Sequence, residues 1–122
     1  MAKTVLVVED NDLNMKLFHD LLEASGYNIL MTRNGLEAID IAREHRPDLI
    51  LMDIQLPLVD GYEATRRIKA DPALKAIPII AVTSYALSGD EEKARAAGCD
   101  AYVAKPYSPR ALLAKIREYL PP

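Results

Sequence analysis

Five side chains that could take part in chemistry stand at the ends of four short apolar runs of this sequence. They comprise three carboxylates, one hydroxyl and one ammonium group: Glu9, Asp10, Asp53, Thr83 and Lys105. Three carboxylates held within a few ångströms repel one another, so such a cluster favours the uptake of a proton or the binding of a cation. Oxygen ligands without cysteine suit Mg²⁺, which keeps several waters and accepts phosphate oxygens as further ligands.

This set of residue types also suits chemistry at phosphorus. A carboxylate beside a bound cation can attack phosphorus and form an acyl phosphate. Phosphoryl transfer mainly requires in-line positioning and neutralisation of the equatorial oxygens. Mg²⁺ would hold one of these oxygens, Lys105 a second as a point charge, and the Thr83 hydroxyl could donate to a third. The residue types therefore predict a site for phosphoryl transfer.

The apolar runs that precede these residues predict the strands that position them. The run Leu49–Met52 is continuous and apolar, which is typical of a strand buried on both faces of a parallel sheet. Pro57 lacks a donor and has a fixed φ, so this strand should end before it. Asp53 is therefore expected at the carboxyl end of a central strand, where open α/β sheets place their ligand crevices.

Five strand–helix units follow one another along the chain, joined by short loops. Strands are expected at 4–8, 27–32, 49–53, 79–83 and 101–104. Helices are expected at 12–25, 34–45, 60–70, 88–97 and 108–120, most of them with capping residues at their start. This alternation predicts a three-layer αβα fold with a parallel, doubly wound sheet in the flavodoxin-like order 2-1-3-4-5. The carboxyl ends of strands one, three, four and five then open on one crevice.

Composition limits the class of protein and its surroundings. At 122 residues the chain is expected to form a single domain over 1–122. Its net charge of −3 does not favour binding to nucleic acid or to an anionic membrane. Cys99 is the only cysteine, which excludes an intrachain disulfide and fits a reducing compartment. We expect a soluble, cytoplasmic protein, because no signal pattern or membrane-length apolar stretch is present.

The first helix carries two apolar stripes. Leu13, Leu17, Leu21 and Ala24 fall on one stripe, which we expect to face the core. A second stripe lies roughly opposite and consists of Met15, Phe18 and Leu22. It either packs under a neighbouring helix or forms a surface on which a partner docks.

Taken together, the motifs resemble the receiver domain of bacterial two-component response regulators. The resemblance covers almost the whole chain and rests on these elements: Glu9-Asp10, Met52-Asp53, Leu56-Pro57, Asp60-Gly61, Thr83 and Lys105-Pro106. The segment from Val8 to Glu23 looks like that of stand-alone receivers which govern the cell cycle in α-proteobacteria. The resemblance implies a phosphoacceptor protein of a phosphorelay, without an output domain, rather than an enzyme acting on free substrates.

The resemblance also implies roles for individual residues. Asp53 would be the phosphoacceptor, and the Mg²⁺ ligands would be Glu9, Asp10, Asp53 and the backbone carbonyl of Gln55. Thr83 and Tyr102 would form the switch that responds to phosphorylation, and the bond before Pro106 would be cis. Gln55 and Tyr85 would tune the rate of autodephosphorylation.

Finally, the resemblance implies two interaction surfaces. A histidine kinase or phosphotransferase would dock on the first helix and the loop before the last one, here through Asn14, Met15, Phe18, Leu22, Tyr85 and Tyr107. Downstream proteins would read a second surface, which phosphorylation remodels and which includes Tyr85, Leu87, Arg95, Tyr102, Tyr107 and Tyr119. Direct contact with nucleic acid or a membrane is not expected.

Two other classes of function fit the pattern less well. An aspartyl-phosphate hydrolase would usually carry a second acid two residues after Asp53, where Gln55 stands, and would need room for a substrate cap. An FMN-binding module would need a loop rich in Ser, Thr or Gly after the first strand. The acidic segment 9–12 would instead repel a phosphate that has no metal.

Overall fold

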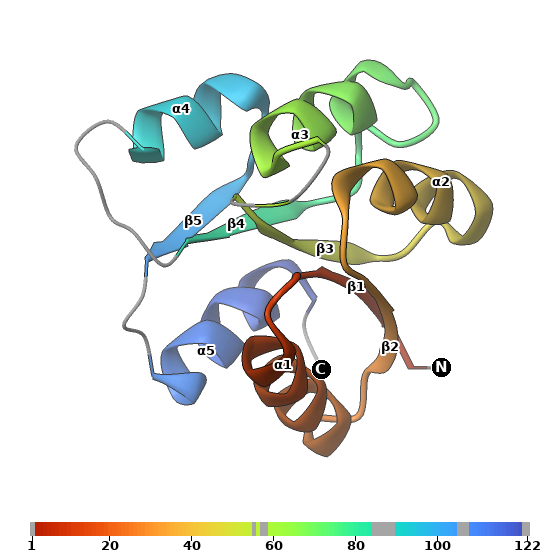
Figure 1. Ribbon diagram of the computed structural model, residues 1–122. Coiled ribbons are helices and arrows are strands. Elements are labelled where there is room, and N and C mark those ends of the chain that lie inside the picture. Colours follow the sequence, from red (N-terminus) through yellow and green to blue (C-terminus); the bar gives the residue numbers. More distant parts are fainter. Residues whose placement is uncertain (1, 55, 57–58, 84–89, 105–107, 121–122) are drawn as a thin grey trace.

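Strands and helices alternate strictly along the chain in the computed structural model, which describes residues 2–54, 56, 59–83, 90–104 and 108–120 (Figure 1). The strands are β1 (Thr4–Val8), β2 (Asn28–Thr32), β3 (Leu49–Asp53), β4 (Ile79–Thr83) and β5 (Ala101–Ala104). The helices are α1 (Asp12–Ala24), α2 (Gly35–His45), α3 (Gly61–Ala70), α4 (Asp90–Ala97) and α5 (Pro109–Tyr119). The predicted boundaries agree with these to within two residues.

The five strands form one parallel sheet in the order β2-β1-β3-β4-β5. Helices α2, α3 and α4 cover one face of this sheet, and α1 and α5 cover the other (Figure 1). The predicted three-layer, doubly wound fold is therefore confirmed. Among the described residues, no helix is both long enough and apolar enough to cross a membrane.

Each face of the sheet has its own core layer, because successive strand residues point to opposite faces. Val5 and Val7 of β1 pack in the layer beneath α1 and α5. Leu6 and Val8 pack in the layer beneath α2, α3 and α4. β3 behaves in the same way, and its residues Leu49–Met52 are all essentially inaccessible to solvent. The continuous apolar run was thus a correct indication of a strand buried on both sides.

Side-chain caps start four of the five helices as the sequence predicted. In each case a side-chain oxygen accepts a hydrogen bond from a backbone amide in the first turn, which otherwise lacks a partner. The capping residues are Asn11, Asn34, Asp60 and Ser108. The expected cap of α4, Ser88, lies outside the described residues.

The prediction for the faces of α1 was wrong. Met15, Phe18 and Leu22 are buried in the core, whereas Leu13 and Leu17 are 66% and 54% exposed. Both stripes are apolar, so periodicity alone did not choose between them. The buried stripe covers the narrower arc of the helix surface. Its two steps, of three and then four residues, turn in opposite directions around the helix axis, whereas each step of four in the other stripe turns about 40° in the same direction. Met15, Phe18 and Leu22 pack with Leu112 and Ile116 of α5, so the alternative that this stripe packs under a neighbouring helix is confirmed, and these three residues offer no docking surface.

Cys99 illustrates how the core controls reactivity. Its side chain is buried, and its Sγ lies 3.7 Å from Oγ1 of Thr65. Burial raises the pKa of the Cys99 thiol, because the thiolate would lose solvation there.

We therefore expect Cys99 to react with iodoacetamide at pH 8 at least about 100-fold more slowly in the folded protein than in denaturant. The folding free energy should also weaken as pH rises through the normal thiol range, because the unfolded chain then releases a proton that the folded chain retains. Mass spectrometry of alkylated protein measures the first effect, and denaturant titrations from pH 7 to 10 measure the second. Equal alkylation rates in the two states would show that the thiol is accessible.

Candidate functional site

The acidic residues meet because β1 and β3 are neighbours with aligned carboxyl ends. Val8 pairs with Met52 in the β1–β3 register, so Glu9 and Asp53 each come one residue later on adjacent strands. Side chains two residues apart on a strand point to the same face of the sheet. Val5, Val7, Leu49 and Leu51 point to the face that α1 and α5 cover, so the side chains of Glu9 and Asp53 are directed to that face as well.

Three carboxylates come together at this edge. Glu9, Asp10 and Asp53 each offer a carboxylate oxygen, and these oxygens lie within 4.8 Å of one another. Glu9 is buried at 1% exposure, Asp53 is half-buried and Asp10 is exposed. The set thus combines a buried acid, whose charged form is penalised by desolvation, with an acid that is exposed to solvent. Its oxygen donors fit a hard divalent cation such as Mg²⁺.

The loop after β1 is held by contacts to the end of β2 and to its own helix. The Glu9 amide donates to the Thr32 carbonyl at 3.0 Å and so prolongs the β1–β2 ladder. Asn11 caps α1 by accepting from the Asn14 amide at 3.0 Å. Arg33, directly after β2, donates from Nη1 to the Asp10 carbonyl at 3.4 Å and forms an ion pair with Asp12.

The chain that follows Asp53 is equally constrained. The Ile54 amide donates to the Val82 carbonyl at 3.2 Å, which continues the β3–β4 ladder, and the Ile54 carbonyl accepts from the Gly61 amide at 3.0 Å. Gly61 therefore brings the start of α3 directly against the end of β3. A Cβ at this position would overlap the Asp53 carbonyl oxygen and lie 2.8 Å from the Ile54 Cα, so only glycine permits the approach.

The two predicted switch residues lie on the strands beyond β3. Thr83 ends β4, is 2% exposed and comes one residue after Val82, the partner of Asp53 in the register. Tyr102 lies on β5 opposite Ala81, half-buried against the core layer beneath α2, α3 and α4. The fold thus brings Thr83 to the same edge of the sheet as the acids and places Tyr102 further back along its strand.

Several predicted site residues lie outside the described residues: Gln55, Tyr85, Lys105, Pro106 and Tyr107. Leu87, expected on the remodelled surface, also lies outside them. Of the predicted docking residues, Asn14 is half-exposed at the start of α1, and Met15, Phe18 and Leu22 are buried. Arg95 and Tyr119, two further residues of the expected remodelled surface, are exposed and half-buried, respectively.

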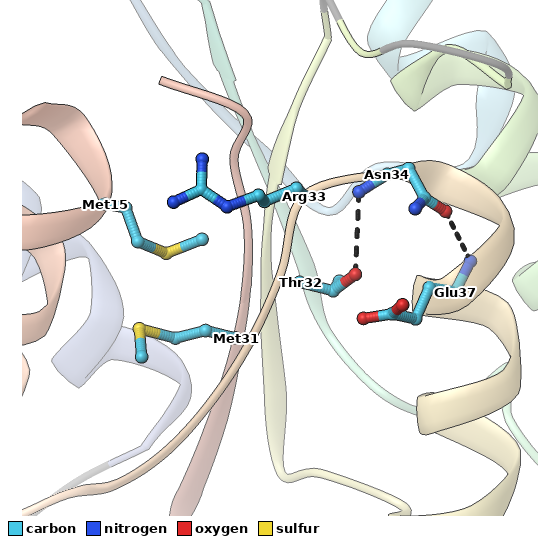
Figure 2. A pocket seen from close by; sticks show the side chains of 6 residues that line it. All are labelled: Met15, Met31, Thr32, Arg33, Asn34 and Glu37. Atoms are coloured by element: carbon cyan, nitrogen blue, oxygen red, sulfur yellow. Dashed lines mark hydrogen bonds between the residues drawn. The ribbon is translucent and has the colours of Figure 1, made fainter. Parts of the chain in front are cut away.

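An open pocket of about 360 Å³ lies where α1, the end of β2 and the start of α2 meet (Figure 2). Its lining residues are Met15, Met31, Thr32, Arg33, Asn34 and Glu37. The polar part of the wall is occupied by local hydrogen bonds: Asn34 donates to Thr32 Oγ1 at 3.5 Å and accepts from the Glu37 amide at 2.7 Å. These bonds fix the backbone on both sides of Arg33.

Sequence reasoning missed two contributions to this site. The contacts of Arg33 with Asp10 and Asp12 were not predicted, because a single exposed arginine belongs to no recognisable sequence motif. Its place directly after a strand was the one available signal. Gly61 was recognised as part of a turn, but its close approach to Asp53 depends on how α3 packs against β3. Neither contact follows from local sequence.

Comparison with known proteins points to one family. The family model described as "Response regulator receiver domain" matches residues 5–117. The chain is 61% identical over 120 residues to the polar-differentiation response regulator DivK of Brucella anthropi, with 98% of each chain covered.

Two solved structures bear on the site. The chain is similar to the receiver domain of a sensor histidine kinase from Pseudomonas aeruginosa PAO1, whose active site cleft holds a coordinated magnesium ion (TM-score 0.91, 38% identity, 98% of each chain). It is also similar to the receiver domain of Ssk1 from Saccharomyces cerevisiae, crystallised with the histidine phosphotransfer protein Ypd1 (TM-score 0.88, 32% identity, 97% of this chain and 88% of that one).

Proposed function

Because the chain belongs to the family of response regulator receiver domains, we propose that Asp53 accepts a phosphoryl group from a phosphohistidine of a partner protein, with Mg²⁺ bound beside it. The observation that carries this proposal is the cluster of Glu9, Asp10 and Asp53 at the carboxyl ends of β1 and β3. The magnesium ion in the related Pseudomonas domain supports the choice of metal.

The residues divide the chemistry among them. Glu9, Asp10 and Asp53 would hold the cation, which supplies positive charge to the transferring phosphoryl group. One oxygen of the Asp53 carboxylate would attack phosphorus in line with the leaving nitrogen. The new O–P bond forms as the N–P bond breaks, and the electron pair of that bond stays on the imidazole of the donor.

Thr83 and Lys105 would receive the transferred group. The Thr83 hydroxyl ends β4 at the same edge of the sheet as the acids, from which a donor hydrogen bond to a phosphoryl oxygen is feasible. Lys105 follows Ala104, the register partner of Thr83. In this proposal the new interaction of Thr83 with the phosphoryl group alters the packing of Tyr102 and the surface around α4, β5 and α5.

We propose that this receiver domain acts as a signalling regulator and carries out no turnover of free substrates. Its output would be contact with downstream proteins, and its similarity to DivK supports a role in polar differentiation or cell-cycle control. The phosphoryl group would come from a histidine kinase or a histidine phosphotransfer protein, as the Ssk1–Ypd1 complex suggests.

The docking surface for that donor is better placed on the outer face of α1 than on the buried stripe first expected. Leu13 and Leu17 are one helical turn apart and are the two most exposed large apolar side chains among the described residues. They lie on the helix that begins immediately after Asp10 and Asn11. A helical partner packed on them would bring its phosphohistidine toward Asp53.

We expect Leu17→Glu to slow phosphotransfer from a cognate histidine phosphotransfer protein by about thirtyfold, the effect of losing a central interface residue. Labelling by acetyl phosphate should be unchanged, because the site itself is intact. Leu36→Glu is the matched control, since it adds the same charge at a side chain that is 42% exposed on α2. Equal slowing in both variants would place the docking surface elsewhere.

The proposed function is tested by incubating the protein with Mg²⁺ and acetyl phosphate. We expect stoichiometric, base-labile phosphate on the peptide that contains Asp53, and none with EDTA or in Asp53→Ala. Label that survives Asp53→Ala would contradict the assignment. Multiple turnover of unrelated phosphate esters would favour the hydrolase, and binding of FMN without metal would favour the flavin module.

A further inference from the structure

We propose that Arg33 is a positioning residue for the metal site: it ties the loop that carries Asp10 to the end of β2 and so preorganises the three carboxylates. The inference rests on the metal-binding role proposed above. It concerns a side chain that contacts none of the reacting atoms.

Two contacts of the Arg33 guanidinium carry the proposal. Nη1 donates to the carbonyl oxygen of Asp10 at 3.4 Å, and Nη2 forms an ion pair with the carboxylate of Asp12. These two acceptors flank Asn11, the residue that caps α1. One planar, forked side chain thus contacts Asp10 and Asp12 at the same time, which a single point charge would do less well.

Arg33 is itself held on a rigid base. Thr32 before it is 3% exposed, and its carbonyl accepts from the Glu9 amide at 3.0 Å. Asn34 after it caps α2. Figure 2 shows the Arg33 side chain extending away from its own strand toward the side on which Met15 of α1 lies. The end of β2 therefore braces the loop of Asp10 from the edge of the sheet.

The contacts of Arg33 oppose the movement of Asp10 that repulsion among the three carboxylates would cause. Asp10 is the exposed member, so without a cation it is the carboxylate that Glu9 and Asp53 can most readily push outward. Arg33 contacts the backbone carbonyl of Asp10, so its hydrogen bond leaves both carboxylate oxygens available to a metal ion. It holds the loop without competing for the ligand atoms.

The direction in which the loss of Arg33 changes Mg²⁺ affinity distinguishes a positioning role from a purely electrostatic one. A positive charge near a cation site repels the cation, so its removal should strengthen Mg²⁺ binding if charge alone matters. A positioning role predicts the opposite, because the loss of the brace leaves Asp10 to be reordered on binding.

The experiment is calorimetric titration of Mg²⁺ into the wild type, Arg33→Ala, Arg33→Lys and Arg43→Ala. Arg43 is the matched control: its side chain is 57% exposed and pairs with Asp71, away from the acids. We expect Arg33→Ala to raise the Mg²⁺ dissociation constant by about fivefold, a modest effect because the ion pair is exposed. Arg33→Lys should lose most of the same affinity, since lysine keeps the charge but lacks the fork.

A second measurement needs no metal. Amide hydrogen exchange at residues 10–12 of the metal-free protein should be faster in Arg33→Ala than in the wild type and unchanged in Arg43→Ala. Unchanged or tighter Mg²⁺ binding in Arg33→Ala overturns the inference while leaving the proposed function intact. A wild type that binds no Mg²⁺ would instead contradict the proposed function itself.

Discussion

Asp10→Asn is expected to raise the melting temperature of the metal-free protein while abolishing its stabilisation by Mg²⁺. The oxygens of Glu9, Asp10 and Asp53 lie within 4.8 Å of one another, and even at the dielectric constant of water two charges at this range repel by about 1 kcal/mol. Removing the charge of Asp10 relieves two such repulsions, so we expect a gain of about 2 kcal/mol, or roughly 8 °C. Calorimetric melting in EDTA measures it.

The same variant should lose the response to metal. At a free Mg²⁺ concentration of about ten times the dissociation constant, the wild type gains about 1.4 kcal/mol. Asp10→Asn lacks one of the three carboxylates and should gain almost nothing, and its labelling by acetyl phosphate should fall by at least about 100-fold.

Asp40→Asn is the control, because it makes the same charge change on the exposed face of α2. It should alter stability by less than about 0.5 kcal/mol and retain both the metal response and the labelling. A metal-free Asp10→Asn protein that is less stable than the wild type would contradict the account. It would mean that Asp10 supports the fold in the absence of a cation.

Gly61→Ala is expected to destabilise the protein by about 3 kcal/mol, at the upper end of the range for overpacking. The new methyl group would overlap the Asp53 carbonyl oxygen and crowd the Ile54 Cα, and these are backbone atoms that cannot rotate away. Either α3 moves outward or the end of β3 shifts. In both cases the hydrogen bond from the Gly61 amide to the Ile54 carbonyl is strained. Denaturant titration measures the loss.

The substitution should also slow phosphorylation, because the crowded carbonyl belongs to Asp53, the proposed phosphoacceptor. A displacement of the acceptor by about 1 Å is enough to slow an in-line transfer by about 100-fold. The control is Gly26→Ala: at Gly26 a Cβ would meet nothing within 4 Å, and the substitution introduces only the strain of φ +87°. That variant should lose about 1 kcal/mol and label normally. Normal labelling in Gly61→Ala would show that the contact does not position Asp53.

Much of this protein follows from its sequence because the relevant signals are local. The unbroken apolar run Leu49–Met52 requires burial on both sides, and helices with capping residues fill the intervals between strands. Parallel strands and right-handed crossovers then leave few arrangements, and the carboxyl ends of adjacent strands must meet. The grouping of Glu9, Asp10 and Asp53 was predictable for this reason.

Tertiary structure alone decided which face of α1 is buried, how Gly61 approaches β3 and what Arg33 contacts. Met15 and Leu17 are both apolar, so only the docking of the helix on the sheet made the first a core residue and left the second 54% exposed. The contacts of Gly61 and Arg33 join segments distant in sequence, and they depend on distances set by packing rather than by residue type. Local sequence patterns thus predicted that the acids lie at one edge of the sheet. Long-range packing determined which residues contact the segments that carry these acids.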